Sequence, residues 1–159
     1  DFFQENDGVG VVGSGSMIYT GGVLTGTKHV ASMHHEISES LRWKNPMIHP
    51  SVAFRTSVLS DGFRYDEMML RCQDYKFWVD LVVGGVTLAN INEPLIEFHR
   101  DYNFIDRRAK SIAVFELRAR LYAARKLGSI CGFLYIFSGL IFVLRHLPNC
   151  FIRFVYRFK

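Results

Sequence analysis

The stretch Gln-Asp-Tyr-Lys-Phe-Trp-Val-Asp-Leu-Val-Val-Gly-Gly, residues 73–85, is the clearest guide to how the chain folds. Its large apolar residues fall on one side of a helix, because residues three and four apart share a helical face. These residues are Phe77, Trp78, Leu81 and Val82. The paired glycines at 84–85 are a typical helix end. The stretch therefore predicts a helix over residues 73–83 with one apolar face.

Short extended segments lie on both sides of this helix. Upstream, the apolar run at 9–12 predicts a buried strand, which a Gly/Ser-rich turn separates from a second extended segment around 17–19. Downstream, residues 86–91 predict one strand, and Pro94 introduces another at 95–98.

Other segments complete this outline of the fold. A short helix is predicted over 31–42, and Asn45-Pro46 ends it before an extended apolar run at 47–54. Residues 62–67 predict a loop. Apolar residues recur every three or four positions over 104–126, which predicts a half-exposed helix.

The composition is that of one globular domain. The chain has 159 residues, of which 49% are hydrophobic and 21% charged, which excludes a collagen, a disordered tail and a disulfide-stapled miniprotein. The three cysteines form no C-x-x-C pair, so a reducing, cytosolic setting is expected. Because Asp1 is neither an initiator Met nor part of a signal peptide, we expect a fragment or a processed chain.

Charge and hydrophobicity are distributed unevenly along the chain. Residues 1–99 carry 7 Lys/Arg and 12 Asp/Glu, whereas residues 100–159 carry 12 and 3. Residues 127–144 hold 18 positions without a charge, a length at the short end of a membrane span. After Pro148, aromatic residues and Arg153 and Arg157 fall on different sides of a basic amphipathic helix.

This C-terminal pattern predicts association with the cytoplasmic face of the cell membrane, either at its surface or through a single span. The alternative is a buried core helix followed by a surface helix. Nucleic acid is the disfavoured partner, because the aromatic residues of the tail lie on its apolar side.

Two short motifs match known sequence patterns, but neither lies in the structural context that its pattern requires. Residues 8–13 fit G-x-G-x-x-G, but they lie within a predicted strand and lead into another extended segment rather than a helix. His34-His35-Glu36 has no second His four residues further on, so it does not predict a zinc-protease helix.

Several segments in a fixed order resemble a known family. They are Asn-Pro-Met-Ile-His-Pro-Ser-Val-Ala-Phe-Arg at 45–55, Gly-Phe-Arg-Tyr-Asp-Glu at 62–67, Gln-Asp-Tyr-Lys-Phe-Trp at 73–78 and Asn-Glu-Pro-Leu-Ile at 92–96. Together they resemble the C-terminal half of glycosyltransferase family 2. The resemblance covers roughly residues 1–126.

The resemblance implies an α/β fold of the GT-A type, with a mixed sheet flanked by helices and followed by C-terminal hydrophobic and amphipathic helices. Residues 1–126 would be the acceptor-side part of the domain, and residues 127–159 the membrane-associating tail. The implied reaction is a single inverting displacement, in which an acceptor hydroxyl attacks the sugar of a nucleotide-diphosphate donor.

The resemblance also implies roles for five residues. Asp74 matches the catalytic base, and a carboxylate in the first turn of a helix suits that role because the helix N-terminus favours its ionised form. Gln73 stands where the family usually has Glu and can still form a hydrogen bond. Trp78 lies either in an acceptor wall or in the core, and His49 either lines the cleft or is structural. Arg100 is a further substrate-binding candidate.

The family binds Mg²⁺ or Mn²⁺ through an Asp-x-Asp motif, which this sequence lacks. The resemblance places this motif upstream of Asp1, and no metal ligand is assigned within the chain. We therefore expect these residues alone to catalyse no transfer and to aggregate through an uncovered sheet edge and apolar surface.

The expected protein is a bacterial, membrane-associated transferase. It would move a sugar from a nucleotide-sugar donor to a glycan or lipid-linked acceptor during surface polysaccharide synthesis in the cell envelope. The alternative is a non-catalytic, membrane-tethered interaction module that retains the fold.

Overall fold

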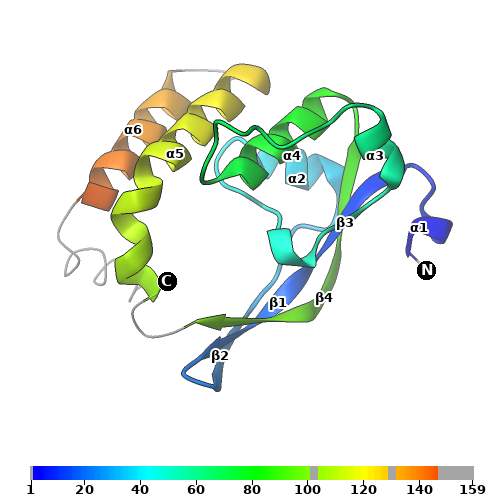
Figure 1. The fold of residues 1–159 in the computed structure, drawn as a ribbon, viewed down its shortest axis with the longest axis horizontal. Helices are drawn as coiled ribbons and strands as arrows, with labels where there is room; N and C mark the ends of the chain where they lie inside the picture. Colours follow the sequence, from blue (N-terminus) through cyan, green and yellow to red (C-terminus); the bar gives the residue numbers. More distant parts are fainter. Residues whose placement is uncertain (1, 101–103, 129–131, 147–159) are drawn as a thin grey trace.

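The computed structural model describes residues 2–100, 104–128 and 132–146. Within them, a mixed sheet of four strands is flanked by helices, which confirms the predicted α/β class (Figure 1). Helices α2 (His34–Ser40) and α4 (Gln73–Val83) pack against the sheet, and α5 (Phe104–Lys126) and α6 (Phe133–His146) lie beyond α4. The short helices α1 (Phe2–Glu5) and α3 (Thr56–Ser60) lie near the other end of the molecule.

Strand β1 (Val9–Thr20) is the centre of the sheet. Strand β4 (Thr87–Arg100) pairs with it in parallel along its whole length. On the other edge, β3 (Ala53–Phe54) pairs antiparallel with the beginning of β1, and β2 (Val23–Lys28) pairs antiparallel with its end.

The predicted turn after residue 12 is wrong, because the Gly/Ser-rich segment continues β1 without interruption. The neighbouring residues approach this part of β1 so closely that only small residues fit. A Cβ on Gly13 would collide with Oδ1 of Asn90, and one on Gly15 would lie 2.8 Å from the carbonyl oxygen of Lys28. The Gly/Ser-rich composition, which is typical of a turn, therefore allows close packing inside a sheet here.

The two strands predicted at 86–91 and 95–98 are one strand, β4. Its register against β1 shifts between Ile91, which lies opposite Ser14, and Pro94, which lies opposite Gly15. A shift of this kind leaves residues out of the regular ladder, and a proline is tolerated there because it has no N–H to donate. Pro94 thus marks an irregularity within a strand and not its beginning.

The extended run predicted at 47–54 is only partly extended. His49–Ser51 form a 3₁₀ turn with Pro50 in its first half, and only Ala53–Phe54 pair with β1. The hydroxyl of Ser51 accepts the N–H of Ser14 at 2.9 Å, which ties the turn to the central strand. The turn changes the direction of the chain just where His49 lies.

Helix α4 has the predicted bounds and supplies most of the core. Its buried residues are Tyr75, Phe77, Trp78, Val79 and Leu81. They belong to one hydrophobic cluster with Val11 of β1, Leu88 of β4 and Ile37 of α2. The helix ends at Gly84, and Gly85 follows with a positive φ of 83°, as the paired glycines predict.

Helix α5 also has the predicted bounds, and two hydrogen bonds fix it to the rest of the domain. Tyr122 donates its hydroxyl to Oδ1 of Asp80 on α4 at 2.5 Å. Arg120 donates to the carbonyl oxygen of Trp43 and, at 2.9 Å, to Glu116. These contacts make α5 part of the same layered structure as α4.

The apolar segment at 127–144 is not one continuous helix in the part that the structure describes. Helix α5 ends at Lys126, Gly128 has a φ of 70°, and α6 begins at Phe133 and contains 14 residues. Among the described residues, no helix combines the length and the apolar character that crossing a membrane requires. The predicted basic amphipathic helix after Pro148 lies outside the described residues, and the division at residue 126 stays a prediction.

Candidate functional site

Asp74 lies in the first turn of α4, where a hydrogen bond orients it. Nδ2 of Asn45 donates to Oδ2 of Asp74 at 2.8 Å. Oδ1 of Asn45 accepts the N–H of Met47 at 3.2 Å, which fixes the amide in turn. Within the described ranges, Oδ1 of Asp74 takes no hydrogen bond. One carboxylate oxygen is therefore held in place while the other is free to accept a proton.

The chain enters α4 through an unusual backbone conformation. Cys72, the residue before the helix, has a φ of 55° and a ψ of 22°, in the left-handed region. This conformation is uncommon for a residue other than glycine. It turns the chain sharply into the helix and sets the direction in which the first turn, with Gln73 and Asp74, is presented.

His49 and Tyr65 lie beside this helix and contact each other. Nε2 of His49 and the hydroxyl of Tyr65 are 2.9 Å apart, and the Tyr65 ring stacks on Phe77 with 4.3 Å between centroids. Burial raises the pKa of Tyr65, and the negative charge of Asp74 adds to the shift. Tyr65 therefore keeps its proton at neutral pH and lies close enough to Asp74 to sense its charge.

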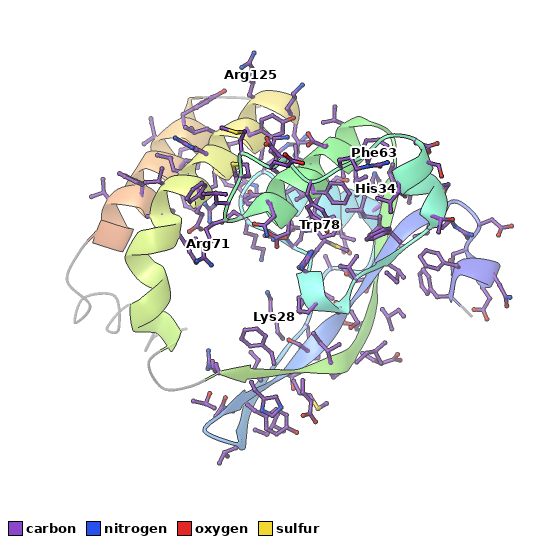
Figure 2. The ribbon with its side chains drawn as sticks, viewed as in Figure 1. Lys28, His34, Phe63, Arg71, Trp78 and Arg125 are labelled. Carbon is purple, nitrogen blue, oxygen red and sulfur yellow. The ribbon has the colours of Figure 1, made fainter. Side chains whose placement is uncertain are left out.

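Trp78 is fully buried, with 0% of its surface exposed. Its ring centroid lies 6.1 Å from that of the exposed His49, and Figure 2 shows Trp78 in the interior. This placement agrees with the core alternative for Trp78. His49 covers it, so a molecule bound at the surface of this structure would meet His49 and Tyr65 first.

The two remaining predicted site residues differ in position. Gln73 is the first residue of α4, next to Asp74, and its side chain has no hydrogen-bond partner among the described residues. Arg100 lies at the opposite end of β4, where its Nε donates to Oγ1 of Thr20 at 3.0 Å. The structure therefore places Gln73 next to Asp74 in the first turn of α4, whereas Arg100 holds the end of β4 to β1.

Two lysines near this group were not predicted as site residues. Partial removal from water lowers the pKa of Lys28, and the positive charge of Lys44 lowers it further. Among the described residues, neither ammonium group has a carboxylate within 4.0 Å. Figure 2 shows Lys28 projecting from the end of β2 toward the side of the molecule where α4 begins. Two neighbouring cations without a direct ion pair favour an anionic ligand.

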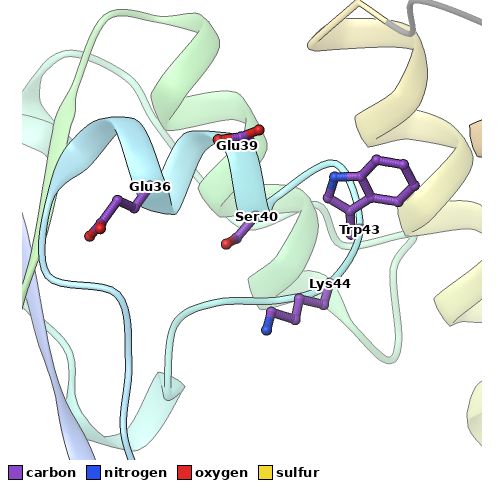
Figure 3. A pocket seen from close by; sticks show the side chains of 5 residues that line it. All are labelled: Glu36, Glu39, Ser40, Trp43 and Lys44. Atoms are coloured by element: carbon purple, nitrogen blue, oxygen red, sulfur yellow. The ribbon is translucent and has the colours of Figure 1, made fainter.

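An open pocket of about 470 Å³ adjoins Lys44 (Figure 3). It is lined by Glu36, Glu39, Ser40, Trp43 and Lys44. Lys44 immediately precedes Asn45, so the pocket wall is continuous in sequence with the residue that orients Asp74. A half-exposed indole beside carboxylates and a hydroxyl offers both an apolar face and hydrogen-bond acceptors. No sequence pattern predicts this pocket, because its residues match no motif.

The described part of the chain contains no group of three or more His, Cys, Asp or Glu side chains that could hold a metal ion. The described residues therefore do not fit the divalent cation that the family resemblance implies.

Comparison with known proteins gives one informative match. An uncharacterised glycosyltransferase of Methanocaldococcus jannaschii is 28% identical over 93 residues, which cover 57% of this chain and 31% of the relative. The chain thus spans about a third of that protein's length. No protein-family profile and no solved structure matches, so family 2 and the GT-A fold stay predictions. Over more than half of its length, the chain is similar to a glycosyltransferase.

Proposed function

We propose that this chain is the acceptor-side part of an inverting, family 2-type glycosyltransferase and that Asp74 is its general base. The observation that carries the proposal is the Asn45–Asp74 hydrogen bond at the start of α4, which orients one carboxylate oxygen and leaves the other available. A carboxylate within hydrogen-bond reach of a hydroxyl is a common general base.

In the proposed step, the oxygen of an acceptor hydroxyl forms a bond to the anomeric carbon of the donor sugar. The bond from that carbon to the diphosphate oxygen breaks, and the nucleoside diphosphate leaves with the electron pair. The hydroxyl proton passes to Oδ1 of Asp74. His49 and Tyr65 would border the acceptor, with Gln73 beside the base.

The charges around the site support an anionic donor and a sugar-bearing acceptor. Lys28 and Lys44 would favour the phosphate groups of a nucleotide sugar. The pocket with Trp43, Glu36 and Glu39 has the groups that bind a sugar ring, an aromatic face and carboxylate acceptors. We propose a glycan or lipid-linked glycan of a surface polysaccharide as acceptor, at the cytoplasmic face of the cell membrane. The divalent cation would be held by residues outside this chain.

The test is Asp74→Asn in the natural full-length protein, assayed for sugar transfer from nucleotide-sugar donors. Loss of a general base lowers the rate by about 10²–10⁴-fold, and folding should not change because Asn is isosteric. Asp61→Asn is the matched control, since Asp61 is an exposed carboxylate at the end of α3. Unchanged turnover by Asp74→Asn would contradict the assignment. Absence of transfer by the unmodified full-length protein would favour the non-catalytic interaction module.

A further inference from the structure

Helix α6 is apolar on two sides. Its inner side faces the domain, where Leu134 and Ser138 are buried and the Phe137 ring contacts Trp43 with 5.7 Å between centroids. Four large apolar residues three or four positions apart lie on another side, which we call the outer stripe. They are Phe133, Ile136, Leu140 and Val143, with exposed fractions of 59%, 71%, 53% and 58%. Phe133 lies at the border of the two sides, because its ring also contacts Trp43 with 6.0 Å between centroids.

The outer stripe is unusual for a helix at the surface of a domain. The side of such a helix that faces water ordinarily carries charged and polar residues. Figure 1 shows α6 as the outermost layer, with α5 between it and α4. A contiguous apolar stripe in this position marks a surface that another molecule or phase covers.

The charge around α6 distinguishes the occupants that this stripe could accept. Arg125 and Lys126 are exposed at the end of α5, directly before the turn into α6, and Arg125 projects away from the domain (Figure 2). Among the described residues from 117 onward, Arg118, Arg125 and Lys126 are exposed cations, and none is Asp or Glu. A second copy of the chain would bring one basic surface against another, whereas an anionic lipid surface complements both the apolar stripe and the charge.

We propose that the outer stripe docks the domain on an anionic lipid bilayer, with α6 lying in the plane of the interface. The 14 residues of α6 span roughly 21 Å, shorter than the roughly 30 Å of the hydrocarbon core, so the helix lies on the bilayer and does not cross it. Arg125, which projects away from the domain, then contacts lipid headgroups, whereas the ammonium of Lys126 lies 5.8 Å from the centre of the Tyr122 ring. This docking does not depend on the transferase reaction.

The test measures binding of the full-length protein to vesicles of an equal mixture of phosphatidylcholine and phosphatidylglycerol, with pure phosphatidylcholine for comparison. We expect binding to the mixed vesicles that weakens as salt is added. Ile136→Glu places a charge in the stripe and should lower the partition coefficient at least about tenfold. Val23→Glu is the matched control, because Val23 is 62% exposed on β2, away from α6.

Arg125→Gln should weaken binding by about fivefold, since one basic residue near the headgroups is lost. Circular dichroism of Ile136→Glu should match that of the unmodified protein, because the side chain points outward. Leu140→Glu, at 53% exposure in the same stripe, is the second variant if the first fails to fold.

Three results would overturn the proposal. Equal binding to both kinds of vesicle, or to neither, would remove the role of anionic lipid. Full binding by both Ile136→Glu and Leu140→Glu would assign the membrane contact to the segment after Pro148. Association of the protein with itself without lipid, abolished by Ile136→Glu, would identify a second copy as the occupant.

Discussion

Replacing Asn45 tests whether the orientation of Asp74 matters for transfer. Asn45→Ala removes the 2.8 Å hydrogen bond to Oδ2 of Asp74. A hydrogen bond to an ionised group contributes about 1.5–3 kcal/mol, which corresponds to about 10–100-fold in rate if the whole effect falls on the transition state. Because Asn45 acts through Asp74, it is a positioning residue. We expect kcat to fall by about this factor, with KM nearly unchanged.

A second variant separates positioning from a merely structural role. Asn45 also accepts the N–H of Met47, so the alanine variant disturbs the local loop as well. Asn45→Asp keeps an acceptor for Met47 but replaces the amide donor with a carboxylate that repels Asp74. If orientation of Asp74 is the important interaction, transfer by Asn45→Asp falls below that of Asn45→Ala.

The assay is steady-state transfer by the full-length protein at several donor and acceptor concentrations, with circular dichroism to verify folding. An Asn45→Asp variant as active as the unmodified protein would refute the reasoning, because it would show that only the bond to Met47 matters. A rise in KM with constant kcat would place Asn45 in substrate binding instead.

Two further predictions concern stability, measured by urea unfolding of the full-length protein. Tyr122→Phe removes the hydrogen bond to Asp80 and should lower the free energy of unfolding by about 1–2 kcal/mol, because the partly exposed Asp80 can be rehydrated. Tyr135→Phe, which changes an exposed tyrosine on α6, is the control and should have no effect. Equal effects of the two variants would contradict a stabilising role for the Tyr122–Asp80 bond. Burial raises the pKa of Tyr75 and of Tyr65 above the ordinary 10.0, so the folded state holds these protons more tightly than the unfolded state. The resulting contribution to the free energy of unfolding is present below about pH 10 and is lost as the pH rises further. A constant free energy of unfolding between about pH 8 and 11 would contradict this prediction.

Helices α4 and α5 were predictable because their signals are local. Apolar residues recur at three and four positions, and glycines follow the end of α4. The sheet was harder to predict, because small residues and a proline inside its strands result from contacts between residues far apart in the sequence. Gly13 is needed by Asn90, 77 positions further along the chain, and Pro94 occupies a register shift that only pairing with β1 creates. Small residues and proline suggest turns only when such neighbours are unknown.

Residues of the candidate site were predictable only where they belong to a recognisable sequence motif. Asp74 and His49 were identified through the family resemblance, and the structure places both beside the beginning of α4. The roles of Asn45 and Tyr65 depend on contacts between separate loops, which no local pattern specifies. Lys28 and Lys44 are unremarkable in sequence, because their importance lies in the electrostatic pairing that the fold brings about.

The left-handed conformation of Cys72 has a consequence for conformational entropy. Glycine would adopt this conformation without strain, but it would also give the segment before α4 more freedom in every state of the protein. A residue with a side chain in this conformation costs about 1 kcal/mol of folding free energy. In return, it restricts the backbone conformations that the next residues can adopt. In the proposed transferase, Asp74 would thereby be pre-organised before an acceptor binds, so that less conformational entropy would be lost on binding.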